Sequence, residues 1–173
     1  MNPILRNERK SSMKTKDEVV DRALRGSIEV GDSASIRDLC RNLFGQGHDI
    51  SQRARALLAC PQFALRPLPE RIDFYVADEA TLGIDGGYCP GDIFPVLERI
   101  GAKKLPAEAI FQYLRHHFVF ESMMLVYMEP MPSPEGYPSV FSVVCGETGV
   151  RIDIHEVYPG AYFTKGTNWM FGL

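Results

Sequence analysis

Hydrophobic residues recur at helical spacing through most of the first 66 residues of the chain. Apolar side chains fall on one side of three segments, residues 16–25, 36–44 and 50–60, as amphipathic helices require. Glycine- and serine-rich turns separate these segments, and Ser33 and Ser35 are candidate N-caps for the second helix. The pattern therefore predicts a helical N-terminal segment at residues 14–66, preceded by a disordered tail at residues 1–13.

The period changes after a linker at residues 61–70, which contains three prolines. Alternation predicts a strand at residues 71–77, and helical spacing returns at residues 92–99 and 106–117, with Asp92 as the cap of the first of these helices. Apolar and alternating runs then predict strands at residues 121–129, 139–145, 150–157 and 168–172. A short GETG turn joins the middle two.

The order of these elements predicts an α+β fold, because helices and strands come in blocks rather than in regular alternation. We expect N-terminal helices, then a β-α-α unit, followed by an antiparallel β-meander of about four strands. Residues 70–173 are expected to form one α+β domain.

The composition is that of a globular protein of ordinary domain size. Of 173 residues, 45% are hydrophobic and 24% are charged. The longest apolar run, residues 123–128, is far shorter than the roughly 20 residues of a membrane-spanning helix. The charged N-terminus lacks the apolar core of a secretory signal, so we expect a cytoplasmic protein with no membrane partner.

Charge and cysteine spacing narrow the choice of ligands. Residues 1–70 carry a net charge of +3 and residues 71–173 carry −6. The acidic part argues against a broad phosphate-binding surface there, whereas nucleic acid is not excluded for the first part. The four cysteines form no CxxC pair, so we predict reduced thiols, no structural metal and no cofactor.

A glycine-rich loop, TLGIDGGYCPGDIF at residues 81–94, is the first candidate for chemistry. Its glycine spacing fits neither a dinucleotide fingerprint nor a P-loop, and Asp92 would compete with a phosphate at the helix N-terminus. Cys89 remains as a candidate thiol, although Asp92 disfavours its thiolate and no histidine is brought near it by pattern. The loop is therefore predicted mainly as a turn.

Histidines offer two further candidates. His116 and His117 with Glu121 do not form the H-E-x-x-H pattern of helical zinc ligands, and adjacent histidines on a helix point about 100° apart, so a metal site is not predicted. Asp153 and His155 share one face of a predicted strand, and Ser142 on the neighbouring strand would be the nucleophile of a hydrolase. The alternation of polar residues favours a solvated sheet face instead.

A polar stripe on the helix at residues 106–117 consists of Glu108, Gln112 and Arg115. It predicts either a solvated surface or a Glu–Arg pair that binds a partner or ties the helix to an acidic loop. The helix pair at residues 33–60 has the outline of a helix-turn-helix, and Ser51 and Arg53 at the start of its second helix are of the type that reads bases.

Residues 69–173 resemble a family of small uncharacterised bacterial proteins. The resemblance rests on PERIDFYVADEATLG, DIFPVLERIGAKKLPAEAIFQYL, YMEP followed by GYPSVFSV, and an aromatic tail around Trp169. The family pattern has a cysteine where this chain has Leu105, so a function of that thiol does not carry over. The resemblance implies no activity, supports residues 70–173 as one unit and points to Glu108 and Glu129.

We therefore expect a cytoplasmic bacterial protein that is a non-enzymatic module binding a protein partner or a small ligand, with homodimerisation as one route. The alternative is a DNA-binding accessory protein that uses residues 33–60, and a hydrolase comes third. No catalytic residue is predicted. The candidate binding residues are Glu108, Gln112, Arg115, Glu129 and Cys89.

Overall fold

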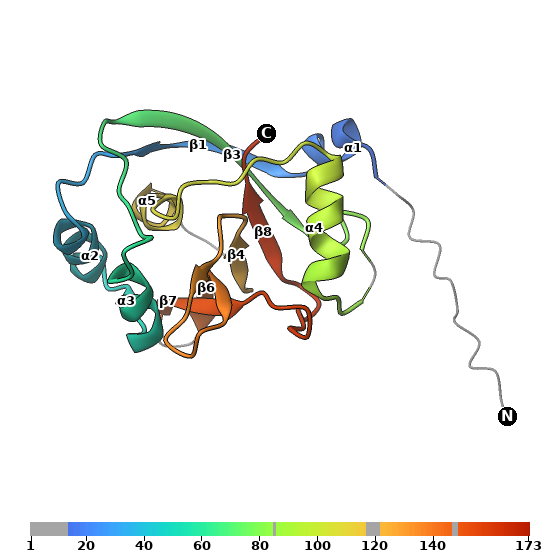
Figure 1. The fold of residues 1–173 in the computed structure, drawn as a ribbon. Coiled ribbons are helices and arrows are strands. Elements are labelled where there is room, and N and C mark those ends of the chain that lie inside the picture. The colour runs from blue at the N-terminus through green and yellow to red at the C-terminus, as the bar shows by residue number, and fades with distance from the viewer. Residues whose placement is uncertain (1–13, 85, 117–121, 147–148) are drawn as a thin grey trace, which may run out of the picture.

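A mixed β-sheet that bends around one buried helix is the frame of the molecule (Figure 1). The computed structural model describes residues 14–84, 86–116, 122–146 and 149–173. Within them lie the helices α1 (Lys16–Val20), α2 (Ile36–Gly45), α3 (Gln52–Leu58), α4 (Pro90–Arg99) and α5 (Ala109–His116). The strands are β1 (Leu24–Val30), β2 (Asp49–Ile50), β3 (Glu70–Asp78), β4 (Met124–Val126), β5 (Met131–Pro132), β6 (Pro138–Gly146), β7 (Gly149–Glu156) and β8 (Asn168–Phe171).

The sheet runs in the order β1-β3-β8-β4-β6-β7-β2, with β5 beside β6. The class is α+β, but the prediction of N-terminal helices followed by an antiparallel meander is wrong. Eight described strands dominate, and the described helices are short. The predicted tail at residues 1–13 lies outside the described residues.

The first correction concerns residues 16–25, where α1 ends at Val20 and β1 begins at Leu24. Residues 24–30 pair antiparallel with β3 along their whole length, so non-local pairing overrides the helical spacing of the local sequence. Gly26 permits this approach, because a Cβ there would lie 2.4 Å from the ring of Phe74. The first part of the chain thus contributes an edge strand to the sheet.

The second correction concerns the last third of the chain. The hairpin β6–β7 is present, but β8 lies between β3 and β4 and pairs parallel with β4. Trp169, Met170 and Phe171 of β8 are fully buried, which suits a central strand and not the free end of a meander. The resulting sheet is mixed.

The structure confirms one of the predicted helix caps and corrects another. Ser35 caps α2 as expected, accepting a hydrogen bond from Asp38 N at 3.1 Å. The N-cap of α4 is Cys89 rather than Asp92, which is the third residue of the helix and accepts from Cys89 N at 2.9 Å. The predicted cap therefore acts from inside the first turn, as in a capping box.

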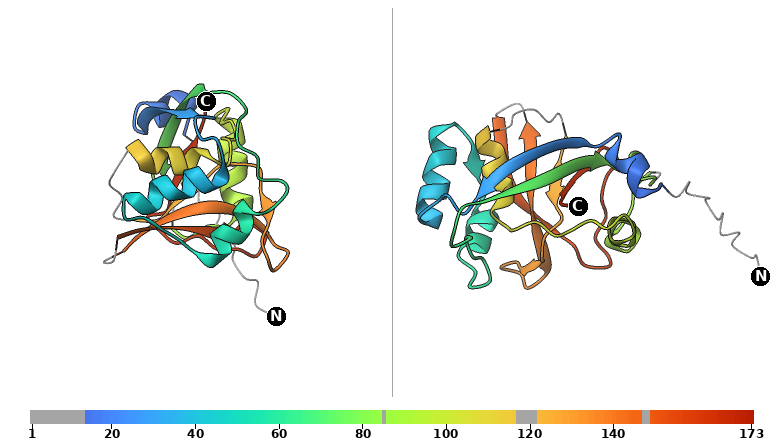
Figure 2. Two further views of the ribbon diagram at one scale, coloured as in Figure 1. Left: turned by 90° about the vertical axis from the view of Figure 1, so that its left-hand side faces the viewer. Right: turned by 90° about the horizontal axis from the view of Figure 1, so that it is seen from above.

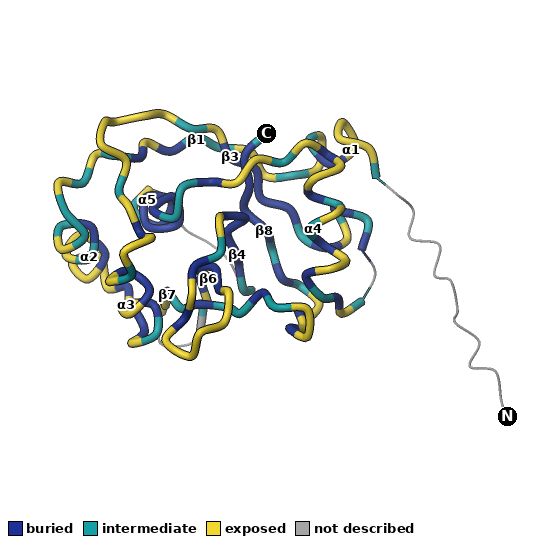
Figure 3. The backbone as a smooth tube through the Cα atoms, in the orientation of Figure 1, coloured by how far each residue is buried: buried dark blue, intermediate teal, exposed yellow. Residues whose placement is uncertain are grey.

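Helix α5 lies within the bend of the sheet, with β1 and β3 on one side and β6 and β7 on the other (Figures 1 and 2). Every residue from Ala109 to Leu114 is buried, and the tube in Figure 3 is dark around this helix. Phe111 packs edge-on against Phe141 of β6 at 5.1 Å between ring centroids. No helix in the described part of the chain combines the length and apolarity of a membrane span.

Candidate functional site

Three of the predicted binding residues meet in a partly buried network around α5. Gln112 Nε2 donates to Asp32 Oδ1, and Arg115 Nη1 donates to Asp32 Oδ2 at 2.6 Å and to Gln112 Oε1 at 2.8 Å. Glu108 Oε1 accepts from Arg66 N at 2.9 Å. We call Asp32, Arg66, Glu108, Gln112 and Arg115 the α5 network. It ties α5 to the turn after β1 and to the linker before β3.

Only the centre of the α5 network is buried. Glu108 and Gln112 are both 0% exposed, whereas Arg115 is half-buried and Asp32 and Arg66 are exposed. At Glu108 and Gln112 the polar stripe is therefore not a solvated surface. Burial raises the pKa of Glu108 against the lowering effect of hydrogen bonds from the backbone of Arg66 and Gly31. Burial also raises the pKa of Asp32, but the hydrogen bond and charge of Arg115 outweigh it and lower that pKa overall. These side chains are held by one another rather than presented to a ligand.

The other two predicted binding residues lie elsewhere. Glu129 stands on the surface with its side chain 81% exposed and pairs with Lys104 Nζ at 2.6 Å. Cys89 Sγ donates to Asp92 Oδ2 at 3.2 Å. Cys89 also lines an open, mainly apolar groove of about 570 Å³ between α4 and Pro159. The structure therefore does not gather the five predicted residues into one site.

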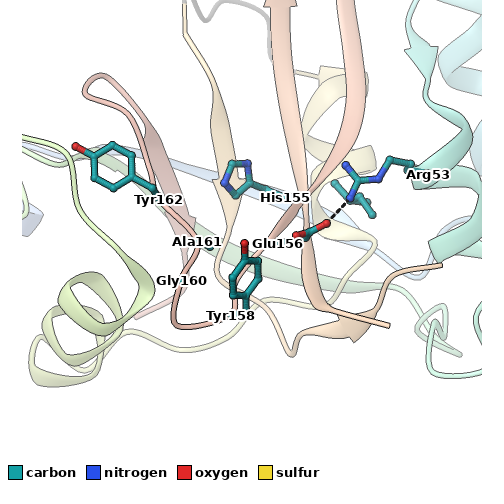
Figure 4. Close-up of a pocket in the computed structure, with 8 residues that line it drawn as sticks. Arg53, His155, Glu156, Tyr158, Gly160, Ala161 and Tyr162 are labelled. Carbon is teal, nitrogen blue, oxygen red and sulfur yellow. Dashed lines mark hydrogen bonds and ion pairs between the residues drawn. The ribbon is translucent and has the colours of Figure 1, made fainter. Parts of the chain in front are cut away.

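A second pocket, of about 300 Å³, has the richer set of polar groups (Figure 4). Its walls come from the end of β7, the loop that follows it and the first turn of α3. We call it the tyrosine pocket, and it is lined by Arg53, Ile154, His155, Glu156, Tyr158, Gly160, Ala161 and Tyr162. Figure 4 shows His155 between Tyr162 and Tyr158, with Arg53 reaching Glu156 from α3.

The loop that carries the two tyrosines is fastened to the glycine-rich loop. Tyr88 and Phe163 exchange backbone hydrogen bonds, 3.2 Å from Tyr88 N and 2.7 Å from Phe163 N. The hydroxyl of Tyr162 lies so close to Gly87 that a Cβ added there would be 1.6 Å away. A larger residue at position 87 would displace the exposed ring of Tyr162, so the glycine accommodates this contact and a phosphate is not needed to explain it.

His155 forms the floor of the tyrosine pocket and packs against Phe163, with 5.1 Å between ring centroids. Burial lowers its pKa, and the charge of Arg53 acts in the same direction. Glu156, the backbone of Tyr162 and Asp153 oppose the shift only in part. At neutral pH the imidazole is therefore uncharged and offers one donor and one acceptor.

Charges at the rim of the tyrosine pocket are unequal. Arg53 Nη2 is 2.7 Å from Glu156 Oε1 and 3.7 Å from Glu135 Oε2. One guanidinium thus faces two carboxylates, which leaves a net negative charge beside the ring of Tyr158. Such a surface disfavours an anion and favours a cation, which the aromatic face also attracts.

The Asp153–His155 hypothesis does not gain a nucleophile. Asp153 Oδ1 accepts from Ser51 Oγ at 2.7 Å, so that carboxylate fixes the start of α3. Ser142 is paired in register with Asp153 but is 1% exposed. None of the residues described as lining the pocket is Ser, Thr, Cys or Lys. The described lining can bind and orient a ligand, but it offers no serine or threonine hydroxyl, cysteine thiol or lysine amine as a nucleophile for His155 to activate.

The helix pair at residues 33–60 is joined through β2, which pairs with β7. Its expected base-reading residues have partners within the chain, since Ser51 and Arg53 bond to Asp153 and Glu156 of β7. Among the described residues, no three His, Cys, Asp or Glu side chains gather as ligands for one ion. His117 and Glu121 lie outside the described residues.

Sequence reasoning missed Glu156, and it considered Arg53 only as a base-reading residue of the alternative DNA-binding hypothesis. The available signal was His155 on a strand that ends in a tyrosine-rich loop, residues 156–163. No protein-family model, curated protein or solved structure matches the chain. The resemblance of residues 69–173 to a bacterial family stays a prediction.

Proposed function

We propose that the chain is a non-enzymatic binding module of the bacterial cytoplasm whose ligand site is the tyrosine pocket. The ligand is a cationic side chain, arginine or lysine, presented by a partner protein. The observation that carries this proposal is the contact of Arg53 with both Glu156 and Glu135, which leaves an unbalanced carboxylate beside an aromatic ring.

The groups around the pocket support recognition rather than turnover. An incoming guanidinium would find a carboxylate at Glu156, the ring of Tyr158 and the neutral imidazole of His155. Charge-assisted hydrogen bonds and cation–π contacts are the usual means of binding such a group. The partly exposed rim leaves room for the backbone of a partner segment.

Titration with short peptides tests the proposal. Peptides with a central arginine or lysine should bind, and the same peptide with citrulline, which keeps the shape and lacks the charge, should bind at least about tenfold more weakly. Isothermal calorimetry measures both affinities. Equal binding of the arginine and citrulline peptides, or turnover of ester, phosphate or peptide substrates, would contradict the proposal.

Two substitutions sharpen the test because they act in opposite directions. Glu156→Gln removes the carboxylate that the cation needs and should weaken binding. Arg53→Gln removes the resident cation and should strengthen it, since both carboxylates are then free. Glu98→Gln, at an exposed position on α4, is the matched control and should leave the affinity unchanged.

A further inference from the structure

Strand β1 stands at one end of the sheet with one edge open. All seven of its residues pair with β3, and none of the described strands pairs with its other edge. The opposite end of the sheet is β2, which is only two residues long. An open edge presents a row of backbone donors and acceptors that a further strand can use.

Strand β1 has charged side chains, at Arg25 and Glu29, but it lacks the other usual protections of an edge strand. Its register with β3 is unbroken from Leu24 to Val30, so no bulge interrupts it, and it contains no proline or lysine. A hollow of about 260 Å³ lies against Ser27, Ile28, Glu29 and Arg71. The strand is regular enough to accept a partner strand over its whole length.

One charged residue of β1 has no ion-pair partner among the residues that the structure describes. Glu29 stands opposite Arg71 in the ladder, but the Arg71 guanidinium donates instead to Ser27 Oγ, at 3.1 and 2.7 Å. Glu29 forms no ion pair with any described residue. Arg25 is 3.7 Å from Asp73, and its side chain remains 66% exposed. Both charges lie on the outer face of the strand.

The sequence of β1 is self-complementary when two copies run antiparallel. A two-fold axis normal to the sheet pairs residues that lie on the same face of the sheet. The allowed registers between the two copies of β1 therefore differ from one another by two residues. With the axis at Ser27, Arg25 of each copy stands opposite Glu29 of the other, and Leu24 stands opposite Val30. Axes at Gly26 or Ile28 bring no opposite charges together.

We propose that β1 is the interface of a two-fold symmetric homodimer, centred on Ser27, in which one sheet continues through both copies. Backbone hydrogen bonds supply the affinity, and the two Arg25–Glu29 pairs select the register. Leu24, which is 57% exposed in the single chain, is then covered by Val30 of the second copy. The surface is separate from the tyrosine pocket, so either proposal can fail alone.

Charge reversal tests the interface. Arg25→Glu makes both charged positions of β1 acidic, and Glu29→Arg makes both basic. A homodimer of either variant would therefore place like charges opposite one another at two positions. We expect the dimer dissociation constant to rise on the order of tenfold in each. Analytical ultracentrifugation across the micromolar range measures the change. Arg37→Glu, at an exposed position of α2, is the matched control and should dimerise like the native chain.

Mixing the two variants gives the decisive result. In the mixed dimer each acidic position meets a basic one, so the two variants should form a heterodimer at concentrations at which each variant alone is mostly monomeric. Damage to the fold of either variant would not be repaired by mixing. The proposal would be overturned by a native chain that stays monomeric, by variants that dimerise as tightly as the native chain, or by a mixture without heterodimers. A second measurement is hydrogen exchange at residues 24–30, which should slow as the protein concentration rises.

Discussion

The α5 network and the tyrosine pocket contain similar side chains, but the two regions differ in what those side chains contact. In the α5 network the carboxylate of Asp32 is bound by Gln112 and Arg115, all within the chain. In the tyrosine pocket the hydroxyl of Tyr158, the imidazole of His155 and the rim carboxylates face an open hollow. The comparison teaches that polar residues on one face of a helix need not be a binding surface, because a loop can cover them.

The difference predicts that substitutions in the α5 network change stability and that substitutions in the pocket change binding. The largest effect should follow Gln112→Ala. It leaves Asp32 and Arg115 without a shared buried partner, at a cost of about 2–3 kcal/mol in the free energy of unfolding. Urea denaturation measures this cost.

The control for that experiment is Gln52→Ala, at an exposed position of α3, which should change the free energy of unfolding by less than about 0.5 kcal/mol. If the two alanine variants were equally stable, the network would not hold the fold, and the contrast between the regions would disappear.

The counterpart in the pocket is Tyr158→Ala. Tyr158 is partly exposed, and its ring packs against that of Tyr137, with 5.2 Å between the ring centroids. The variant should lose affinity for the arginine peptide by roughly tenfold through loss of the aromatic face. Its free energy of unfolding should fall by no more than about 1 kcal/mol. Calorimetric titration and urea denaturation give the two values, and a large loss of stability without a loss of affinity would reverse the assignment.

The pH dependence of stability separates the regions in a third way. Burial raises the pKa of Glu108 above its ordinary value of 4.5, so the folded state favours the protonated carboxyl. The stability that this group contributes is complete below pH 4.5 and is lost as the pH rises through the folded pKa.

The glutamine of the Glu108→Gln variant cannot ionise. The free energy of unfolding of this variant should therefore increase relative to that of the native chain as the pH rises from about 4 to 7. The lowered pKa of His155 acts in the opposite direction, because the stability that His155 contributes is lost as the pH falls from 6.5 through its folded-state pKa. His155 is present in both proteins, so this contribution cancels when the variant is compared with the native chain. Urea midpoints across this range measure the difference. The same substitution at exposed Glu129 should show no such trend.

The smallest effect should follow Glu129→Ala. The carboxylate is mostly exposed, and although its hydrogen bond raises the pKa of Lys104, solvent screens the pair. We expect a change within about 0.5 kcal/mol in the free energy of unfolding and no change in peptide affinity. A larger value in thermal or urea denaturation would place Glu129 in a functional surface after all.

Local periodicity predicts the parts of this fold that depend on local sequence. It gives the α+β class, strand β3, helices α2 to α4 and the β6–β7 hairpin. It misses β1, and it predicts the strand at residues 168–172 but not the place of that strand between β3 and β4, which depends on pairing with residues far away in the chain. Residues 24–30 do alternate between the two faces of a strand, but the helical spacing at residues 16–25 overlaps the start of that signal.

The sites show the same limit. Gln112 and Asp32 are 80 residues apart, so the polar stripe carries no sign of the loop that buries it. Arg53 and Glu156 are 103 residues apart, and neither residue type alone indicates a pocket. Only His155 was identifiable, as one of the polar residues on a strand face, and its proposed triad partners have other contacts.

The chain has a single tryptophan, and its position makes it a spectroscopic reporter of the tyrosine pocket. Trp169 is 0% exposed and donates from Nε1 to the hydroxyl of Tyr88 at 2.9 Å. Its indole packs edge-on against Phe163, with 5.2 Å between ring centroids, and the ring of Phe163 also packs against the imidazole of His155. Intrinsic fluorescence should therefore respond to occupation of the pocket in the native chain, with no label attached.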